Sequence, residues 1–328
     1  MKYVIAVDLG ATNLRVGIYS FDGELRNLHI IRTPSKGGKN TIAEVIYDIG
    51  IKLLRDLGLS GDEVVGIGIG TIGPLDIRRG EVVNTPNLEL RSFRLREPLI
   101  DLFNKNHVYV VNDCVAGVWG EKTFGHGVNY SNVVYVTIST GVGGGVVIND
   151  NLMLGKDGNA HEVGHLVINY DDELRCGCGG VGHWEAYASG SGIPRFVKHY
   201  MKNLTTKHRN SIVSLDDEVT TPEEFFNRVR TGSKLFNDIC YEICKINAAG
   251  LASIVNAYDP ELITIGGSVA LANYGLIIEP AIKLLKQYSL NRLPEIKPTK
   301  LGSETVLKGA ASLVIKPPKT LLEIYGTS

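Results

Sequence analysis

The segment 161–185, HEVGHLVINYDDELRCGCGGVGHWE, concentrates side chains that bind metal ions. Thiolate and imidazole ligands in the order H-x10-C-x-C-x4-H suit tetrahedral zinc. The glycines beside the cysteines let the chain fold tightly around an ion. The sequence therefore predicts a zinc site with four ligands, His165, Cys176, Cys178 and His183.

Four protein ligands leave no open coordination position, so this zinc would be structural rather than catalytic. Metal binding on the order of 10 kcal/mol can fix a loop and the orientation of its neighbours. Those neighbours here are the carboxylates Glu162 and Glu185. The literal H-E-x-x-H match at 161–165 is a poor metalloprotease motif, because Gly164 disfavours the helix that must carry both histidines.

Three turns of small residues could hold phosphate groups, because backbone N–H groups approach phosphate oxygens closely where side chains are small. The turns lie at 10–13, 139–144 and 266–268, and each follows an apolar run. An ordinary hairpin is the alternative for each turn alone, whereas the three together favour a nucleotide. None matches the P-loop or the dinucleotide-binding fingerprint, so a nucleotide would bind through hairpins.

Two aspartates stand at the ends of apolar runs. Asp8 precedes the turn at 10–13, where a carboxylate could hold Mg²⁺ through water, or could simply cap the turn. Asn112 and Asp113 end the run HVYVV before a helical segment. In an open α/β sheet this place projects into a crevice, although Asp113 could equally be the N-cap of the helix.

Two further loops could contact a polar ligand. They are GTIGPLD at 70–76, which contains Gly73, and NTPNL at 84–88, which contains Asn87. Gly, Pro and Asn in such loops suit hydrogen bonds to a ligand and suit plain turns equally well.

The elements that must position these residues alternate between strands and helices. Strands are predicted at β-branched runs that end in turns, over 2–9, 13–19, 25–31, 63–70 and 107–113, and a strand followed by a glycine turn is predicted over 261–270. Helices are predicted from apolar residues at helical spacing over 41–58 and after Asp113, and near 185–200, 221–231, 233–258, 276–288 and 304–316. This order predicts an α/β protein.

The strand, turn and strand at 4–23 return at 133–151, which predicts two halves built on one plan. A chain of 328 residues also exceeds the usual size of one compact domain, so we expect two lobes with a central cleft. The expected small lobe is 1–115 plus about 303–328, and the expected large lobe is 116–302 with the zinc-binding loop.

Charge and hydropathy narrow the range of partners. The formal net charge is -1 and charges of both signs are dispersed, which disfavours nucleic acid and anionic membranes as partners. No apolar run approaches the length of a membrane span, and the chain opens on a strand-like run rather than a signal peptide. The five cysteines do not suggest a disulfide framework. These features predict a cytoplasmic protein with a small-molecule substrate.

The motifs together resemble the ROK family of sugar kinases, within the actin-like/hexokinase superfamily. The resemblance runs over essentially the whole chain and is carried by DLGATN, GIGTIGPLD, Asn112-Asp113, STGVGGG, the E-x-G-H pair and CGCGGVGHWE. It implies a two-lobed actin-like (ribonuclease H-like) ATPase fold, with a duplicated β-meander plus α/β halves.

The resemblance also implies roles for individual residues. Asp113 would be the catalytic base. The sugar would be held by Gly73, Asn87, Asn112, Asp113, Glu162, His165 and Glu185. The Mg²⁺-ATP would be surrounded by Asp8, Gly10, Ala11, Thr12, Asn13, Thr140, Gly141 and Gly267.

Two positions depart from the family pattern. The family usually has a third cysteine where this chain has His183, and zinc accepts the resulting Cys₂His₂ set. The family commonly has glycine where His161 precedes Glu162, so His161 could change the loop or touch the sugar.

The reaction implied is transfer of the ATP γ-phosphoryl group to the 6-hydroxyl of a hexose, with glucose favoured. An N-acetylglucosamine, N-acetylmannosamine or fructose kinase is the alternative, because loop geometry selects among sugars. A sugar sensor without catalysis, an actin-like ATPase and a zinc-dependent DNA-binding regulator are the other classes. Proteins of such families are usually dimers, so a homodimer or higher homo-oligomer is expected.

Overall fold

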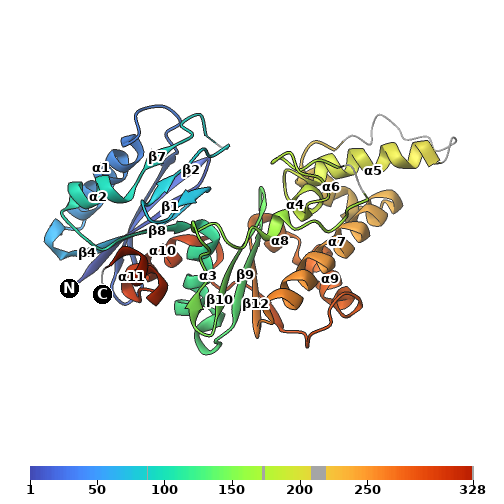
Figure 1. The fold of residues 1–328 in the computed structure, drawn as a ribbon. Coiled ribbons are helices and arrows are strands. Elements are labelled where there is room, and N and C mark those ends of the chain that lie inside the picture. The colour runs from blue at the N-terminus through green and yellow to red at the C-terminus, as the bar shows by residue number, and fades with distance from the viewer. Residues whose placement is uncertain (87, 172–173, 208–218, 327–328) are drawn as a thin grey trace. The chain divides into compact units, whose positions relative to one another are not determined.

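The structure is a computed structural model that describes residues 1–86, 88–171, 174–207 and 219–326. The chain forms two compact units (Figure 1). The first comprises Met1–Tyr135, Gly145–His161 and Thr299–Ser328, and the second comprises Val136–Gly144 and Glu162–Pro298. The first unit is therefore assembled from both ends of the chain.

The first unit is built on a five-stranded sheet in the order β3-β2-β1-β4-β8. Its strands are β1 (Tyr3–Leu9), β2 (Asn13–Ser20), β3 (Leu25–Arg32), β4 (Val64–Thr71) and β8 (Val108–Asn112). The strands β1, β2 and β3 form an antiparallel meander, whereas β1, β4 and β8 are parallel. The predicted strands in this part of the chain are confirmed to within one or two residues at their ends.

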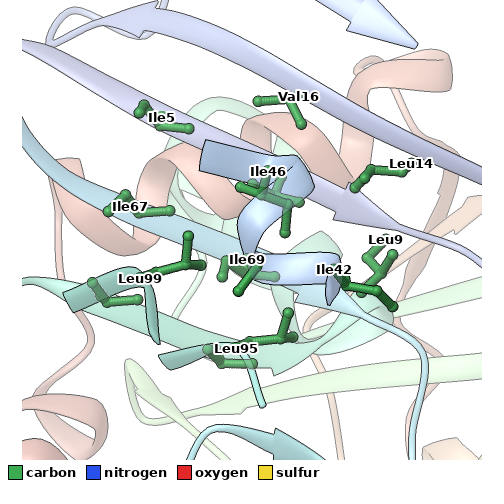
Figure 2. Close-up of a cluster of buried hydrophobic side chains, with 14 of the residues drawn as sticks. Ile5, Leu9, Leu14, Val16, Ile42, Ile46, Ile67, Ile69, Leu95 and Leu99 are labelled. Atoms are coloured by element: carbon green, nitrogen blue, oxygen red, sulfur yellow. The ribbon is translucent and has the colours of Figure 1, made fainter. Parts of the chain in front are cut away.

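One face of this sheet carries the apolar core of the unit. Ile5 and Leu9 of β1 and Ile67 and Ile69 of β4 are buried in one cluster with the apolar side of helix α1 (Thr41–Asp56), as Figure 2 shows. Burying each such side chain contributes about 1.5–3 kcal/mol. Because side chains alternate along a strand, Asp8 lies on the opposite face of the sheet.

On that opposite face, glycine allows a helix to touch the sheet. Helix α10 (Thr305–Ile315) packs on β4, where a Cβ at Gly68 would overlap the carbonyl oxygen of Ala310. The same helix packs on α3 (Asp113–Phe124), and a Cβ at Gly309 would overlap the carbonyl oxygen of Ala116. Any larger residue at these glycines would push α10 away from the sheet.

Smaller elements complete the first unit. They are η1 (Gly61–Glu63), β5 (Leu75–Asp76), β6 (Glu81–Val82), β7 (Phe93–Arg94), α2 (Arg96–Phe103), η2 (His126–Asn129), β11 (Asn151–Leu152), η7 (Gly302–Glu304) and α11 (Lys319–Tyr325). The small sheet β5-β6-β7, α2 and α11 were not predicted, because such short elements show little periodicity.

A second five-stranded sheet has the order β11-β10-β9-β12-β13. Its other strands are β9 (Val133–Ile138), β10 (Val142–Ile148), β12 (Leu262–Gly266) and β13 (Glu295–Pro298). The strands β10 and β11 pair antiparallel and β12 and β13 pair parallel, as their counterparts do in the first sheet. The predicted duplication within an α/β fold is confirmed.

Apart from β12, β13 and the parts of β9 and β10 within Val136–Gly144, the regular elements described in the second unit are helices. Its helices are η3 (Val163–His165), α4 (Trp184–Ala188), α5 (Ile193–Lys207), α6 (Pro222–Arg230), α7 (Lys234–Tyr258), α8 (Ser268–Ala272), η5 (Tyr274–Ile278), α9 (Glu279–Leu284) and η6 (Leu285–Gln287). The single helix predicted near 185–200 is two helices, because the chain turns at Ser189, whose hydroxyl oxygen accepts a hydrogen bond from the Gly192 N–H at 2.9 Å.

The two compact units divide the chain at other positions than the expected lobes do. The expected boundary at 115/116 falls inside α3, and all of α3 belongs to the first unit because it packs on α10. The segment Gly145–His161 also belongs to the first unit. Among the residues described, no helix is long and apolar enough to cross a membrane.

Candidate active site

In the first unit, the three parallel strands end at one edge of the sheet. Leu9 of β1 is paired in register with Thr71 of β4, which is paired with Asn112 of β8. The turn at 10–13, the loop at 72–77 and Asp113 follow these three strand ends directly. The register therefore brings three predicted ligand-binding segments to the carboxyl edge of the sheet, where α/β proteins place their ligands.

Asp113 is the first residue of α3, and Asn112 is its N-cap. The side-chain oxygen of Asn112 accepts a hydrogen bond from the Cys114 N–H at 2.9 Å, and Asp113 Oδ1 accepts from the same N–H at 2.8 Å. The alternative that Asp113 is the N-cap is therefore wrong. Burial raises the pKa of Asp113, and its hydrogen bonds with Cys114 oppose that rise.

Asp8 carries a second carboxylate with a raised pKa. Burial, followed by the negative charge of Asp113, raises the pKa of Asp8 to about 6, although Arg15 lowers it. Arg15 lies opposite Asp8 in the register of β1 and β2, with its Nη1 3.3 Å from Asp8 Oδ2. Two neighbouring carboxylates with raised pKa values suit a bound cation, since the ion would offset the repulsion between them.

The turn between β1 and β2 holds the predicted phosphate-binding residues. Gly10 N–H donates to the Asn13 carbonyl at 2.9 Å, which closes the hairpin. Thr33, which sequence reasoning missed, directly follows β3 and holds the turn, since its hydroxyl donates to the Gly10 carbonyl at 2.7 Å. Ala11, Thr12 and Asn13 are exposed, so the tip of the turn is accessible to a ligand.

The loop after β4 is bound to a distant segment of the first unit. Asn159 forms two hydrogen bonds with the backbone of Leu75, each 2.7 Å long. Gly73 lies in the same loop, and a Cβ on it would stand 3.6 Å from Asn159 Oδ1 and 3.8 Å from Asn112 Nδ2. The predicted ligand residue Asn87 lies outside the described residues.

His161 has a left-handed backbone, with φ of 70°. Only glycine adopts this conformation without strain, so the geometry explains why a glycine would be common here. The ring of His161 is buried, and its Nε2 is 2.8 Å from the Met153 carbonyl oxygen. Burial lowers the pKa of His161, although the hydrogen bond with Met153 opposes that shift.

In the second unit, Glu185 joins α4 to the turn between β9 and β10. Its Oε2 accepts a hydrogen bond from the Val142 N–H at 3.0 Å. A Cβ on Gly141 would lie 2.5 Å from the same oxygen, so only glycine leaves room for the carboxylate. The N–H of Ser191 also donates to the Thr140 carbonyl at 3.1 Å. The predicted nucleotide residues Thr140 and Gly141 thus share a hydrogen-bonded cluster with a predicted sugar ligand.

Gly267 lies between β12 and α8 with φ of 91°. A Cβ there would overlap the backbone of Ile138 at the end of β9. Close packing against β9 therefore requires glycine at this position, whether or not a nucleotide contacts it.

The E-x-G-H pair flanks the short helix η3. Glu162 precedes η3 and its side chain is exposed, whereas His165 ends the helix and is half-buried. The His165 N–H donates to the Glu162 carbonyl at 2.9 Å, so both residues belong to one turn. A Cβ on Gly164 would overlap the Val142 carbonyl, which places this turn directly against the start of β10.

Three of the four predicted zinc ligands converge. The ligand atoms of His165, Cys176 and His183 all lie within 4.8 Å of one another. Cys178 lies beside them, with its Sγ 3.3 Å from His183 Nδ1. The Nδ1 of His165 is buried and has no hydrogen-bond partner in the described part of the chain. The donor set and this orphaned nitrogen fit a zinc ion, whose ligand bonds are about 2.0–2.3 Å long.

Comparison with known proteins identifies relatives over the whole chain. The chain is 39% identical over 321 residues to a glucokinase of Pyrobaculum calidifontis, covering 98% of each. The crystal structure of a ROK hexokinase from Thermus thermophilus matches with a TM-score of 0.78 and 29% identity, covering 94% of this chain and 97% of that one.

A ROK family glucokinase from Streptomyces griseus, solved in complex with glucose and AMPPNP, matches with a TM-score of 0.70 and 29% identity. The alignment covers 95% of this chain and 98% of that one. These neighbours confirm the predicted actin-like α/β fold. The model of the ROK family matches residues 4–317, and the chain belongs to this family.

Proposed function

We propose that this protein transfers the γ-phosphoryl group of ATP to the 6-hydroxyl of a hexose, with glucose as the favoured substrate. The observation that carries the proposal is the pair Asp8 and Asp113, two carboxylates with raised pKa values beside the same sheet edge. The full-length similarity to glucokinases supports glucose among the hexoses. The ROK glucokinase with glucose and AMPPNP supports ATP as the donor.

Asp113 would be the catalytic base. Its place at the start of α3 would be held by the capping hydrogen bond of Asn112 and by its own bond, both from the Cys114 N–H. Burial raises its pKa, which makes it a better proton acceptor than a free aspartate once it is ionised. A carboxylate is still too weak to deprotonate a free alcohol, so the proton should move late in the transfer.

Asp8 and the hairpin turns would hold Mg²⁺-ATP. When bound, Mg²⁺ neutralises charge on the transferring phosphoryl group. Asp8 would hold the ion through water, and Arg15 keeps that carboxylate oriented and ionised. The phosphates and nucleoside would lie against the turn residues Gly10, Ala11, Thr12, Asn13, Thr140, Gly141 and Gly267.

The sugar would be held through hydrogen bonds to its hydroxyl groups. We assign its hydroxyl contacts to Gly73, Asn87, Asn112, Asp113, Glu162, His165 and Glu185. This assignment makes Gly73→Ala an informative variant. A Cβ at Gly73 would make only ordinary van der Waals contacts within the protein. A loss of sugar binding would therefore come from a clash between this Cβ and the sugar.

The Cys/His cluster would bind a structural zinc through His165, Cys176, Cys178 and His183. Its role would be to hold the E-x-G-H turn and α4 in a fixed relation, because η3 and α4 each carry or adjoin a ligand. Elemental analysis of the purified protein should find about one zinc per chain. Cys178→Ser should lower that content, whereas Cys240→Ser in α7 should not.

We also infer two properties of the whole protein. None of the five cysteines, all of which the structure describes, forms a disulfide; this suits a reducing compartment, so we assign the protein to the cytoplasm. We further infer a homodimer or higher homo-oligomer that works on small molecules and binds neither nucleic acid nor membrane. Analytical ultracentrifugation of the purified protein measures its oligomeric state directly.

The test is ADP release from Mg²⁺-ATP across a panel of glucose, mannose, fructose, N-acetylglucosamine and N-acetylmannosamine. Glucose should give the highest kcat/KM. Asp113→Asn should lower kcat by about a thousandfold while equilibrium glucose binding stays within a few-fold. Asp101→Asn, on the exposed side of α2, is the matched control and should keep full activity. Sugar binding without sugar-dependent ADP release would instead identify a sensor.

A further inference from the structure

We propose that Asn159 is a positioning residue that sets the affinity of this protein for its sugar, by holding the loop at 72–77 through the backbone of Leu75. The inference rests on the proposed function, in which Gly73 of that loop contacts the sugar. It assigns a role to a segment, 154–161, whose own side chains contribute nothing to the proposed ligand contacts.

The contact between Asn159 and Leu75 is a paired amide interaction. Asn159 Nδ2 donates to the Leu75 carbonyl at 2.7 Å, and the Leu75 N–H donates to Asn159 Oδ1 at 2.7 Å. One side chain thus satisfies both backbone groups of a residue 84 positions away, as a neighbouring strand would. The pairing requires both a donor and an acceptor, which asparagine has and aspartate lacks when ionised.

The segment that carries Asn159 is itself rigidly held. Ala160 N–H donates to the Leu154 carbonyl at 3.2 Å, which closes the segment into a loop. The Ile77 N–H donates to the Asp157 carbonyl at 3.1 Å, a second tie to the 72–77 loop. A Cβ on Gly158 would lie 2.7 Å from the Ile77 side chain, so the two loops are in close contact.

The hydrogen bonds between Asn159 and Leu75 hold a loop where the sugar would bind. Gly73 lies two residues before Leu75, and a Cβ added to it would stand 3.6 Å from Asn159 Oδ1 and 3.8 Å from Asn112 Nδ2. Asn112 is the N-cap of α3 and precedes Asp113. Asn159 therefore fixes the spacing between the Gly73 backbone and the residues at the start of α3. In the described part of the chain, the side chain of Asn159 forms hydrogen bonds with Leu75 and Asp157 and none with the turn at 10–13, so nucleotide binding should not depend on it.

The consequence is an effect confined to the sugar. Losing two hydrogen bonds worth about 1 kcal/mol each would let the 72–77 loop leave its sugar-binding conformation. The bound sugar would then have to select the competent fraction of loops, which weakens its apparent affinity by that fraction. The chemical step of a saturated enzyme would proceed in the same geometry.

The experiment compares Asn159→Ala, Asn159→Asp and wild type. We expect the KM for glucose to rise about tenfold in Asn159→Ala, and further in Asn159→Asp, whose second oxygen would face the Leu75 carbonyl. The KM for ATP and the kcat at saturating glucose should stay within about twofold. Equilibrium glucose binding without ATP should weaken by the same factor as KM.

Asn151→Ala is the matched control. Its side-chain Nδ2 also donates to a backbone carbonyl, that of Asn149, at 2.8 Å in an exposed turn of the same unit. This variant should keep wild-type values of both KM constants. Asn159→Ser, which keeps a small polar side chain, is measured in parallel so that a poorly folding Asn159→Asp does not decide the result.

Three outcomes would overturn the inference. An unchanged glucose KM in the Asn159 variants would mean that the loop holds its conformation without the two hydrogen bonds to Leu75. A similar rise in the glucose KM and the ATP KM, with a fall in kcat and a lower melting temperature, would mean a merely structural role. An equal loss in Asn151→Ala would mean the same. A wild-type protein without sugar-dependent ADP release would refute the proposed function, whereas an active wild type with insensitive Asn159 variants would refute only this inference.

Discussion

The same hairpin occurs twice in this chain, and only one copy carries a charge. In the β1–β2 hairpin, Asp8 stands one residue before the end of the first strand. In the β9–β10 hairpin the matching position is Thr137. Both turns are closed by a backbone hydrogen bond of 2.9 Å, from Gly10 N–H in one and from Ser139 N–H in the other.

The supports of the two turns differ as well. The first turn is held by Thr33 of the adjoining meander. The second is held by residues from a separate segment, through Glu185 and the backbone of Gly190 and Ser191. The backbone geometry of the turn is thus present in both copies, whereas the charged side chain and the supporting residues differ between them.

The most severe way to break this comparison is to give the first hairpin the residue of the second. Asp8→Thr should lower kcat/KM by about a hundredfold or more, because the carboxylate that would hold the cation is gone. ADP release measured over a range of Mg²⁺ concentrations checks this. Asp48→Asn, exposed on α1, is the control. Near-normal activity of Asp8→Thr would show that the charge difference between the hairpins has no catalytic meaning.

The same variant should gain stability. Asp8 has a pKa of 3.8 in an unperturbed state and about 6 in the folded protein, so the folded state binds more protons between these values. Wild-type stability therefore falls as pH rises through that window. Asp8→Thr escapes this cost and should exceed wild type at pH 8 by on the order of 1 kcal/mol. Urea denaturation at pH 4 should show a smaller gain, and an equal gain at both pH values would contradict the assignment.

A third prediction compares the glycines of the two turns. Gly141→Ala should lower kcat/KM by about thirtyfold, because its Cβ would lie 2.5 Å from Glu185 Oε2 and displace that carboxylate. Gly10→Ala should cost less than about fivefold, because its Cβ would lie 3.3 Å from the Asn13 carbonyl oxygen, which can shift slightly. Steady-state kinetics of the two variants side by side decide this. The reverse order would mean that the supports of the turns do not control them.

The smallest expected effect concerns Arg15. Arg15 lowers the pKa of Asp8, so Arg15→Met should raise that pKa further. If activity requires ionised Asp8, the fall in activity on the acid side of the pH profile should then begin at a higher pH. We expect the ratio of kcat/KM at pH 8 to that at pH 6 to grow about fivefold, with Arg15→Lys close to wild type. An unchanged ratio would separate Arg15 from the ionisation of Asp8.

Much of the fold could be predicted because its signals are local. Alternation and turn residues located β1, β2, β3, β4 and β8, and the repeat of the hairpin pattern indicated the second sheet. The break between α4 and α5 was missed because, besides the local turn at Ser189, it depends on Ser139 of another segment, whose carbonyl accepts from the Gly190 N–H at 2.7 Å. Short elements such as α2 were missed because eight residues carry little periodicity.

The candidate site divides in the same way. Asp8 and Asp113 could be predicted because a carboxylate at the end of a buried strand is visible in the sequence itself. Thr33, Arg15 and Asn159 could not, because their roles depend on partners brought close by folding. Arg15 is defined by strand register, and Asn159 by a loop 84 residues away.

The close contact of α10 with β4 has a consequence for how the protein is made. On the ribosome, the strands of the first sheet emerge early, but the helix that covers their glycine-lined face is at 305–315. Residues 162–298 of the second unit emerge in between. The first unit must therefore wait, with one face of its sheet uncovered, until nearly the whole chain has been translated. Such late long-range contacts slow folding and expose strands to aggregation, so we expect this half of the nascent chain to be the principal client of chaperones.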